Sequence, residues 1–271
     1  MDLARHSASI PFVRTLDARW LGDDASGINM QLPLAPAVRD AQAPDHIDLR
    51  AAIALLDYAG GAAVYAATAS AATATIELRI DVLDAPAAGA DAWVDAAVIA
   101  QGCGSALVHG AAASSPRGAP FARLVGRYIL GSGPGQAPAD AAYAAARDAA
   151  VARFASAGAG DASSFDETLG AREVEGDWCL PFADRLVGSV TLPAFHGGAI
   201  AAALMTAARA AVPAATPLEL ASLTVRYLHA ARGVATSCRA RVVKSGPRAA
   251  FVDVDAVQGD RTVAVLHALF G

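Results

Sequence analysis

The triplet His196-Gly197-Gly198 is the first candidate for chemistry in this sequence. It follows an extended run that ends at Pro193 and precedes an alanine-rich helical stretch with no charge before Arg209. Two glycines at a helix start leave backbone N–H groups uncovered at the positive end of the helix dipole. Such donors suit a developing negative oxygen, so the triplet indicates an oxyanion site. The alternative is a glycine-rich loop that only leads into a core helix.

Asp57 is the second candidate, because it stands between Leu56 and Tyr58 in another mostly apolar helical stretch. A carboxylate buried on such a helix is costly unless it has a partner, which favours a function. It can act as a nucleophile or as a general base, and the sequence leaves both routes open. An incidental helix acid is the competing interpretation.

Two apolar helices, predicted over residues 48–67 and 197–212, are the elements that position these groups. Extended pieces precede each helix: two within residues 16–36 around a turn at 22–24, and two at 173–180 and 186–192. Strands are predicted after each helix, namely 73–83, 93–101, 105–114 and 121–130, then 218–229, 235–243, 248–257 and 262–270.

The two halves repeat each other. The segment LRIDVLDAPAAG matches TVRYLHAARG, VIAQGCGSALV lies over VVKSGPRAAFV, and VGRYILG lies over VLHALFG. The separations are 145 (225 − 80), 144 (246 − 102) and 140 (271 − 131), and this ordered drift indicates a duplicated domain. We predict an N-terminal unit over 1–131, a linker over 132–170 with an alanine-rich helix at 139–157, and a C-terminal unit over 171–271. Two such units can pair edge to edge, which removes one exposed edge from each sheet.

Composition restricts the class of protein further. The chain has 271 residues, 55% of them hydrophobic, and a net charge of −5, which argues against a nucleic-acid partner. Three widely spaced cysteines, Cys103, Cys179 and Cys238, suggest neither a disulfide framework nor a metal site. The N-terminus lacks the apolar core of a signal peptide, and the alanine run at 199–211 is too short to span a membrane. We therefore expect a cytoplasmic protein with no membrane partner.

The segment FHGGAIAAALMTAA is followed by the predicted strands VRYLHAARG and ARVVKSGPRAAFVDVDAV. With this motif and this strand order, the chain resembles the tandem, or double, hotdog acyl-CoA thioesterases. The branch that it resembles is the phenylacetate-degradation thioesterases. The resemblance implies an α+β fold of two tandem hotdog units, each an antiparallel sheet wrapped around a long apolar central helix. It also implies an acyl-CoA thioester as substrate, no cofactor, and association into homo-oligomers.

In single-domain relatives, the helix start of one subunit faces an acidic residue on the helix of the other. That acid stands nine positions after the motif histidine, roughly 13 Å along a helix, so a single helix cannot supply both groups. Nine positions after His196 stands Met205, which can neither attack nor accept a proton. Overlaying the two helices at a separation of 148 (205 − 57) places Asp57 at the position of Met205.

The resemblance therefore implies one composite site and one dead site. Asp57 from the first helix faces His196, Gly197 and Gly198 from the second. Gly198 N–H, with Gly197, would bind the thioester oxygen, and His196 would orient the loop or the carbonyl. In the dead site, Asp48-Leu49-Arg50 replaces the His-Gly-Gly triplet opposite Met205.

Lys244 and Arg248 flank a predicted hairpin and are candidates for contacts with coenzyme A phosphates, with a solvated turn as the alternative. Two other functions stay open. A hotdog enoyl-CoA hydratase or dehydratase also uses one histidine and one acid, although those relatives carry a proline-rich loop where this chain has two glycines. A non-catalytic acyl-CoA-binding module is the other.

Overall fold

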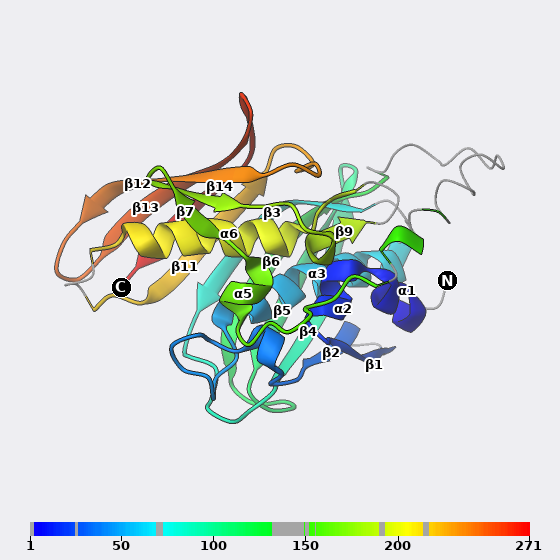
Figure 1. Ribbon diagram of the computed structural model, residues 1–271. Helices are drawn as coiled ribbons and strands as arrows, with labels where there is room; N and C mark the ends of the chain where they lie inside the picture. The colour runs from blue at the N-terminus through cyan, green and yellow to red at the C-terminus, as the bar shows by residue number, and fades with distance from the viewer. Residues whose placement is uncertain are drawn as a thin grey trace.

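The computed structural model describes residues 3–24, 27–68, 73–131, 149, 152–154, 156–189, 193–213 and 217–271. Two long central helices lie against one antiparallel sheet (Figure 1). They are α3 (Leu49–Thr68) and α6 (Gly197–Ala211), and each is buried along most of its length. By length and composition α3 could cross a membrane, but 72% of its most apolar window is buried in the protein. Such burial is what a core helix shows.

The sheet has twelve strands. Outward from its centre, the equivalent strands of the two halves follow one another in the same order. The N-terminal half runs β3-β6-β5-β4-β2-β1 and the C-terminal half runs β11-β14-β13-β12-β8-β7. Their bounds are β1 Arg19–Asp24, β2 Gly27–Leu32, β3 Ala74–Val82, β4 Ala92–Gly102, β5 Ser105–Ala113, β6 Pro120–Ile129, β7 Arg172–Val174, β8 Asp177–Leu180, β11 Leu220–Tyr227, β12 Thr236–Ser245, β13 Ala250–Gln258 and β14 Arg261–Phe270. This is the α+β, double-hotdog architecture that the repeat predicts.

The halves join at β3 and β11, which pair antiparallel from Glu77 with Arg226 to Asp81 with Ser222. The outermost of these pairs is also an ion pair, with 2.8 Å between Arg226 Nε and Glu77 Oε2. The predicted edge-to-edge pairing is therefore confirmed, and it removes one exposed edge from each half.

Two details of the extended pieces differ from the prediction. The predicted turn at 22–24 is wrong, because Gly22 lies inside β1 at a register shift and β2 begins at Gly27. The piece at 173–180 is a hairpin, since Glu175 and Gly176 both have positive φ between β7 and β8. Such a pair of left-handed residues is what a two-residue turn between antiparallel strands requires.

Short helices precede the first strand of each half, and the sequence analysis did not predict them. They are α1 (Leu3–Ser9) and α2 (Pro11–Thr15) at the N-terminus, and α5 (Phe165–Leu169) before β7. Most of the alanine-rich helix expected at 139–157 lies outside the described residues. The remaining elements are η1 (Pro36–Val38), η2 (Asp184–Leu186), β9 (Val187–Ser189) and β10 (Ala194–Phe195).

The helices α2 and α5 are themselves a repeat. The pattern F-x-x-T-L-x-A-R begins within each helix, and its two copies have a constant separation of 153 residues (165 − 12, 168 − 15 and 172 − 19). Each helix is followed by an equivalent left-handed residue, Asp17 with φ 54° after α2 and Gly170 with φ 69° after α5. The duplicated unit therefore includes the short helix ahead of its first strand.

Candidate active site

The helices α3 and α6 cross antiparallel, and the start of each lies against the middle of the other. At one end of the contact between the two helices, His196 Nδ1 lies 3.6 Å from Asp57 Oδ2. At the other end, Arg50 Nη1 donates to Thr206 Oγ1 at 2.7 Å. The structure thus brings Asp57 together with His196, Gly197 and Gly198, although 139 residues (196 − 57) separate the acid from the histidine. Whether these four residues carry catalysis stays a prediction.

His196 is the N-cap of α6. Its backbone is extended, its N–H donates to Leu186 O at 2.8 Å, and its Nδ1 accepts the N–H of Gly198 at 2.9 Å. An imidazole nitrogen that accepts a hydrogen bond carries no proton, so the ring is the tautomer protonated at Nε2. Burial lowers the pKa of His196, which keeps this ring neutral, while the nearby Asp57 acts in the opposite direction.

Asp57 is 3% exposed. Thr75 Oγ1 on β3 donates to Asp57 Oδ1 at 2.7 Å, which leaves Oδ2 facing the start of α6. Burial raises the pKa of Asp57, although His196, Thr75 and the N–H of Gly198 each act to lower it. A carboxylate with a raised pKa is a stronger base than an ordinary aspartate, as general-base chemistry requires.

The two glycines are needed for different contacts. A Cβ at position 197 would lie 2.7 Å from Asp57 Oδ2, so Gly197 leaves the carboxylate its place. A Cβ at position 198 would lie 2.7 Å from the Cα of Ala54, so Gly198 allows the two helices to approach. Uncovered N–H groups are therefore an incomplete explanation of the glycine at position 198, because a methyl there would meet α3 first.

Two tyrosines support the site from the sheet, and the sequence analysis did not find their role. Tyr128 on β6 donates its hydroxyl to the backbone oxygen of Asp57 at 3.1 Å. Tyr227 on β11 donates to the backbone oxygen of Gly197 at 3.0 Å. Burial raises the pKa of both hydroxyls well above the usual range, and the charge of Asp57 adds to this effect. Both therefore act as neutral hydrogen-bond donors.

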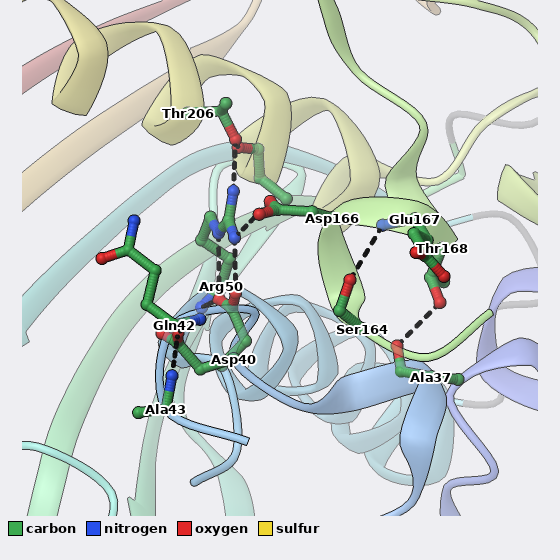
Figure 2. A network of polar contacts seen from close by, with 12 residues as sticks. Ala37, Asp40, Gln42, Ala43, Arg50, Ser164, Asp166, Glu167, Thr168 and Thr206 are labelled. Carbon is green, nitrogen blue, oxygen red and sulfur yellow. Dashed lines mark hydrogen bonds and ion pairs between the residues drawn. The ribbon is translucent and has the colours of Figure 1, made fainter.

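The predicted dead site contains an ion-pair network around Arg50 (Figure 2). Asp48 caps α3 as His196 caps α6, accepting the N–H of Arg50 at 2.8 Å. Arg50 pairs with Asp48, donating from Nε to Oδ1 at 2.9 Å and from Nη2 to Oδ2, and it also donates to Asp166 on α5 at 2.7 Å. Burial alone would lower the pKa of Arg50, but Asp48 and Asp166 raise it, so the guanidinium stays charged. Arg50 thus occupies the place that corresponds to Gly198 at the other site.

The variant Asp48→Asn is expected to lose stability and to keep its activity. The neutral asparagine cannot form an ion pair with Arg50, which retains only Asp166 and Thr206. Breaking a buried pair by changing one partner costs about 3 kcal/mol. Urea unfolding should show this loss, and thioester turnover of the folded variant should equal that of the wild type. A large loss of turnover would contradict the assignment of a dead site.

Lys244 and Arg248 lie at the β12–β13 hairpin, and both are exposed. Lys244 lines a shallow depression of about 560 Å³, together with Phe251 and His267. None of the four candidate catalytic residues lines this depression among the residues that the structure describes. A contact of Lys244 or Arg248 with coenzyme A stays a prediction.

Comparisons with known proteins agree with this geometry. Residues 188–271 match the family model of the acyl-CoA thioesterase N-terminal domain. A search of curated proteins finds no match. A crystal structure with a hotdog fold from Alicyclobacillus acidocaldarius is similar over 96% of both chains, with a TM-score of 0.58 and 11% identity. Residues 188–271 are therefore similar to an acyl-CoA thioesterase domain, and the whole chain has the fold of hotdog proteins.

Two further solved structures resemble the whole chain. The tesB protein of Mycobacterium avium subspecies paratuberculosis has a TM-score of 0.59 at 11% identity, over 95% of this chain and 97% of that one. The 12:0-ACP thioesterase of Umbellularia californica has a TM-score of 0.58 at 10% identity, over 93% and 99%. At such identities the likeness shows the fold alone, and the similarity to an acyl-CoA thioesterase domain is limited to residues 188–271. The predicted phenylacetate-degradation branch stays a prediction.

Proposed function

We propose that this hotdog thioesterase hydrolyses an acyl-CoA thioester at one composite site, made of Asp57 from α3 and His196-Gly197-Gly198 from α6. The observation that supports it best is the 3.6 Å separation between Asp57 Oδ2 and His196 Nδ1, at a helix start whose Gly198 N–H points toward them. This arrangement places a base beside an anion-binding helix end. The pseudo-equivalent site lacks both features, because Met205 replaces the acid and Arg50 fills the glycine position.

Each residue then has one task. The thioester oxygen takes over the N–H of Gly198 from His196 Nδ1, and this donor stabilises the negative charge that develops on the oxygen. Thr75 holds Asp57 Oδ1, so that Oδ2 faces the carbonyl carbon. Tyr227, through the backbone oxygen of Gly197, fixes the first turn of α6.

Asp57 can act by either of two routes. As a general base it removes a proton from water, whose oxygen attacks the carbonyl carbon, and the tetrahedral intermediate expels the thiolate. The carboxylic acid then returns the proton to the thiolate. As a nucleophile it expels the thiolate and forms a mixed anhydride, whose aspartyl carbonyl carbon water attacks in a second step. Hydrolysis in ¹⁸O-labelled water under single-turnover conditions distinguishes the routes, because only cleavage at the aspartyl carbonyl of the anhydride places protein oxygen in the acid product and ¹⁸O in Asp57.

Release of free thiol is the direct test of the function. Acyl-CoAs of increasing chain length are mixed with the protein and a thiol reagent, and hydration of an enoyl-CoA is followed in parallel. We expect thiol release that depends on enzyme concentration and no hydration. Hydration without thiol release would support a hydratase, and binding without either reaction would support an acyl-CoA-binding module. Each of those two results would overturn the proposal.

A further inference from the structure

The imidazole of His196 lies between two aromatic rings. The ring of Phe12 on α2 is 5.0 Å away, centroid to centroid, at an interplanar angle of 36°. The ring of Tyr58 on α3 is 6.1 Å away at 47°. Tilted aromatic pairs at such distances are favourable, and two of them restrict how a ring can rotate. The orientation of His196 therefore depends on α2 as well as on its own helix.

The N-terminal helices hold this arrangement firmly. Phe12 is fully buried, and Ser7 on α1 is 3% exposed. The hydroxyl groups of Ser7 and Tyr58 are 2.6 Å apart, so α1 fixes the tyrosine that flanks His196. Arg14 on α2 donates from Nε to Ala157 O at 3.0 Å and from Nη2 to Phe154 O, which ties the pair to the segment ahead of α5. Figure 1 shows α1 and α2 beside α3 and near β9.

The pseudo-symmetric position provides a comparison within the same chain. Phe165, the counterpart of Phe12 in the F-x-x-T-L-x-A-R repeat, is also fully buried. Its ring lies under the guanidinium of Arg50, with the central carbon 5.6 Å from the ring centroid. The helix α2 packs on η2 of the C-terminal half, as α5 packs on η1 of the N-terminal half. In each case the short helix of one half covers the helix start of the other half.

We propose that Phe12 is a positioning residue for the composite site, which acts by holding the imidazole of His196 in the orientation that directs Nδ1 at the N–H of Gly198. Ser7 contributes through Tyr58. This inference rests on the proposed function, and it extends that function by making α1 and α2 part of the site.

The physical reason is the geometry of the cap. The hydrogen bond from Gly198 to His196 Nδ1 is 2.9 Å long, and the same nitrogen is 3.6 Å from the Asp57 carboxylate. If the ring turned over, Cδ2–H would take the place of Nδ1, and the N–H of Gly198 would lose its acceptor. A smaller side chain at position 12 leaves room for this rotation. The start of α6 would then be less well aligned with Asp57.

The test compares Phe12→Leu with Phe165→Leu, two equally buried phenylalanines at equivalent places in the repeat. Steady-state kinetics with an acyl-CoA should show a fall in kcat of about 10- to 100-fold for Phe12→Leu, the effect of a misplacement on the order of 1 Å. KM should change little. Phe165→Leu should keep the wild-type kcat, since Arg50 takes no part in the reaction. Ser7→Ala, a milder change, should lower kcat in the same direction by less.

A second readout does not depend on turnover. ¹⁵N NMR of the imidazole nitrogens should show a single Nε2–H tautomer of His196 in the wild type and in Phe165→Leu. In Phe12→Leu it should show averaged or mixed signals. Equal losses of kcat in both phenylalanine variants, or an unchanged His196 signal in Phe12→Leu, would overturn the inference. If the wild type hydrolysed no acyl-CoA, the proposed function would fail, and the NMR comparison would still decide whether Phe12 positions His196.

Discussion

Asp57→Asn should lower kcat/KM for acyl-CoA hydrolysis by about 10²–10⁴-fold, the usual contribution of a general base. The asparagine has the shape of the aspartate, and its side-chain oxygen can still accept from Thr75 Oγ1. It cannot remove a proton from water or attack a carbonyl carbon. The binding of a nonhydrolysable acyl-CoA, measured by calorimetry, should stay close to that of the wild type. Retention of wild-type turnover by a folded Asp57→Asn protein would exclude Asp57 as the catalytic carboxylate.

The stability of this variant should change in the opposite direction to its activity. Because burial raises the folded-state pKa of Asp57, the ionised form is disfavoured in the folded protein. The contribution of Asp57 to stability is therefore fully present below its unfolded pKa of about 3.9 and is lost as the pH rises through the raised folded value. Asparagine has no such loss, so the Tm advantage of Asp57→Asn should be larger at pH 8 than at pH 4.

Asp48→Asn is the matched control, because Asp48 is the other buried aspartate at the helix crossing. Asp57→Asn should lose turnover and keep or gain stability. Burial raises the pKa of Asp48 as well, but a change at position 48 leaves the largely buried Arg50 without its nearest carboxylate, so Asp48→Asn should lose stability and keep turnover. The pH dependence of the wild type gives an independent check. The acid limb of kcat/KM should lie above the usual aspartate pKa of about 3.9. An acid limb at the ordinary value would contradict a buried catalytic carboxylate.

The sequence was sufficient to predict the two central helices, the strands after them and the residues that meet at the composite site. The reason is that hydrophobic period and internal repetition can both be detected in the sequence without knowledge of tertiary contacts. A helix of 15 or 20 mostly apolar residues is expected to be buried. The meeting of Asp57 with His196 then follows from the repeat, because in two antiparallel helices related by a pseudo-two-fold axis the middle of each lies against the start of the other.

Other features depend on contacts that no local pattern reveals. Thr75 reaches Asp57 only because β3 passes α3 in one register, and a hydroxyl in a strand carries no signal of that register. The helices α1 and α2 have seven and five residues, too few for a hydrophobic period to show. A signal for α2 did exist, since F-x-x-T-L-x-A-R occurs twice at a separation of 153. It could have extended the duplicated unit to include Phe12.

The two glycines show how the physical explanation of a motif can be incomplete. From the sequence, both glycines are explained by access for a substrate oxygen. In the structure, Ala54 of α3 fills the space beside Gly198, and the Asp57 carboxylate fills the space beside Gly197. Helix crossing and site geometry therefore impose separate demands on adjacent residues, which the pair of alanine variants can separate.

Gly198→Ala should be the more damaging of the two for stability. Its methyl would lie 2.7 Å from the Cα and 2.8 Å from the Cβ and O of Ala54, and backbone atoms cannot rotate away. Relief requires α3 and α6 to separate, and overpacking of this kind costs about 1–3 kcal/mol. Since the same separation moves the start of α6 away from Asp57, turnover should fall as well, by about 10²–10³-fold if the N–H of Gly198 no longer reaches the oxyanion.

Gly197→Ala should instead lose activity with a smaller loss of stability. Its methyl would lie 2.7 Å from Asp57 Oδ2, which is the end of a side chain that can turn aside. The carboxylate would then leave the place from which it faces the carbonyl carbon, and its hydrogen bond from Thr75 would weaken. Urea unfolding and acyl-CoA turnover, measured on both variants, should therefore rank them in different orders. If Gly197→Ala proved as unstable as Gly198→Ala while retaining its turnover, Oδ2 of Asp57 could not be the reacting oxygen, because the methyl occupies its place.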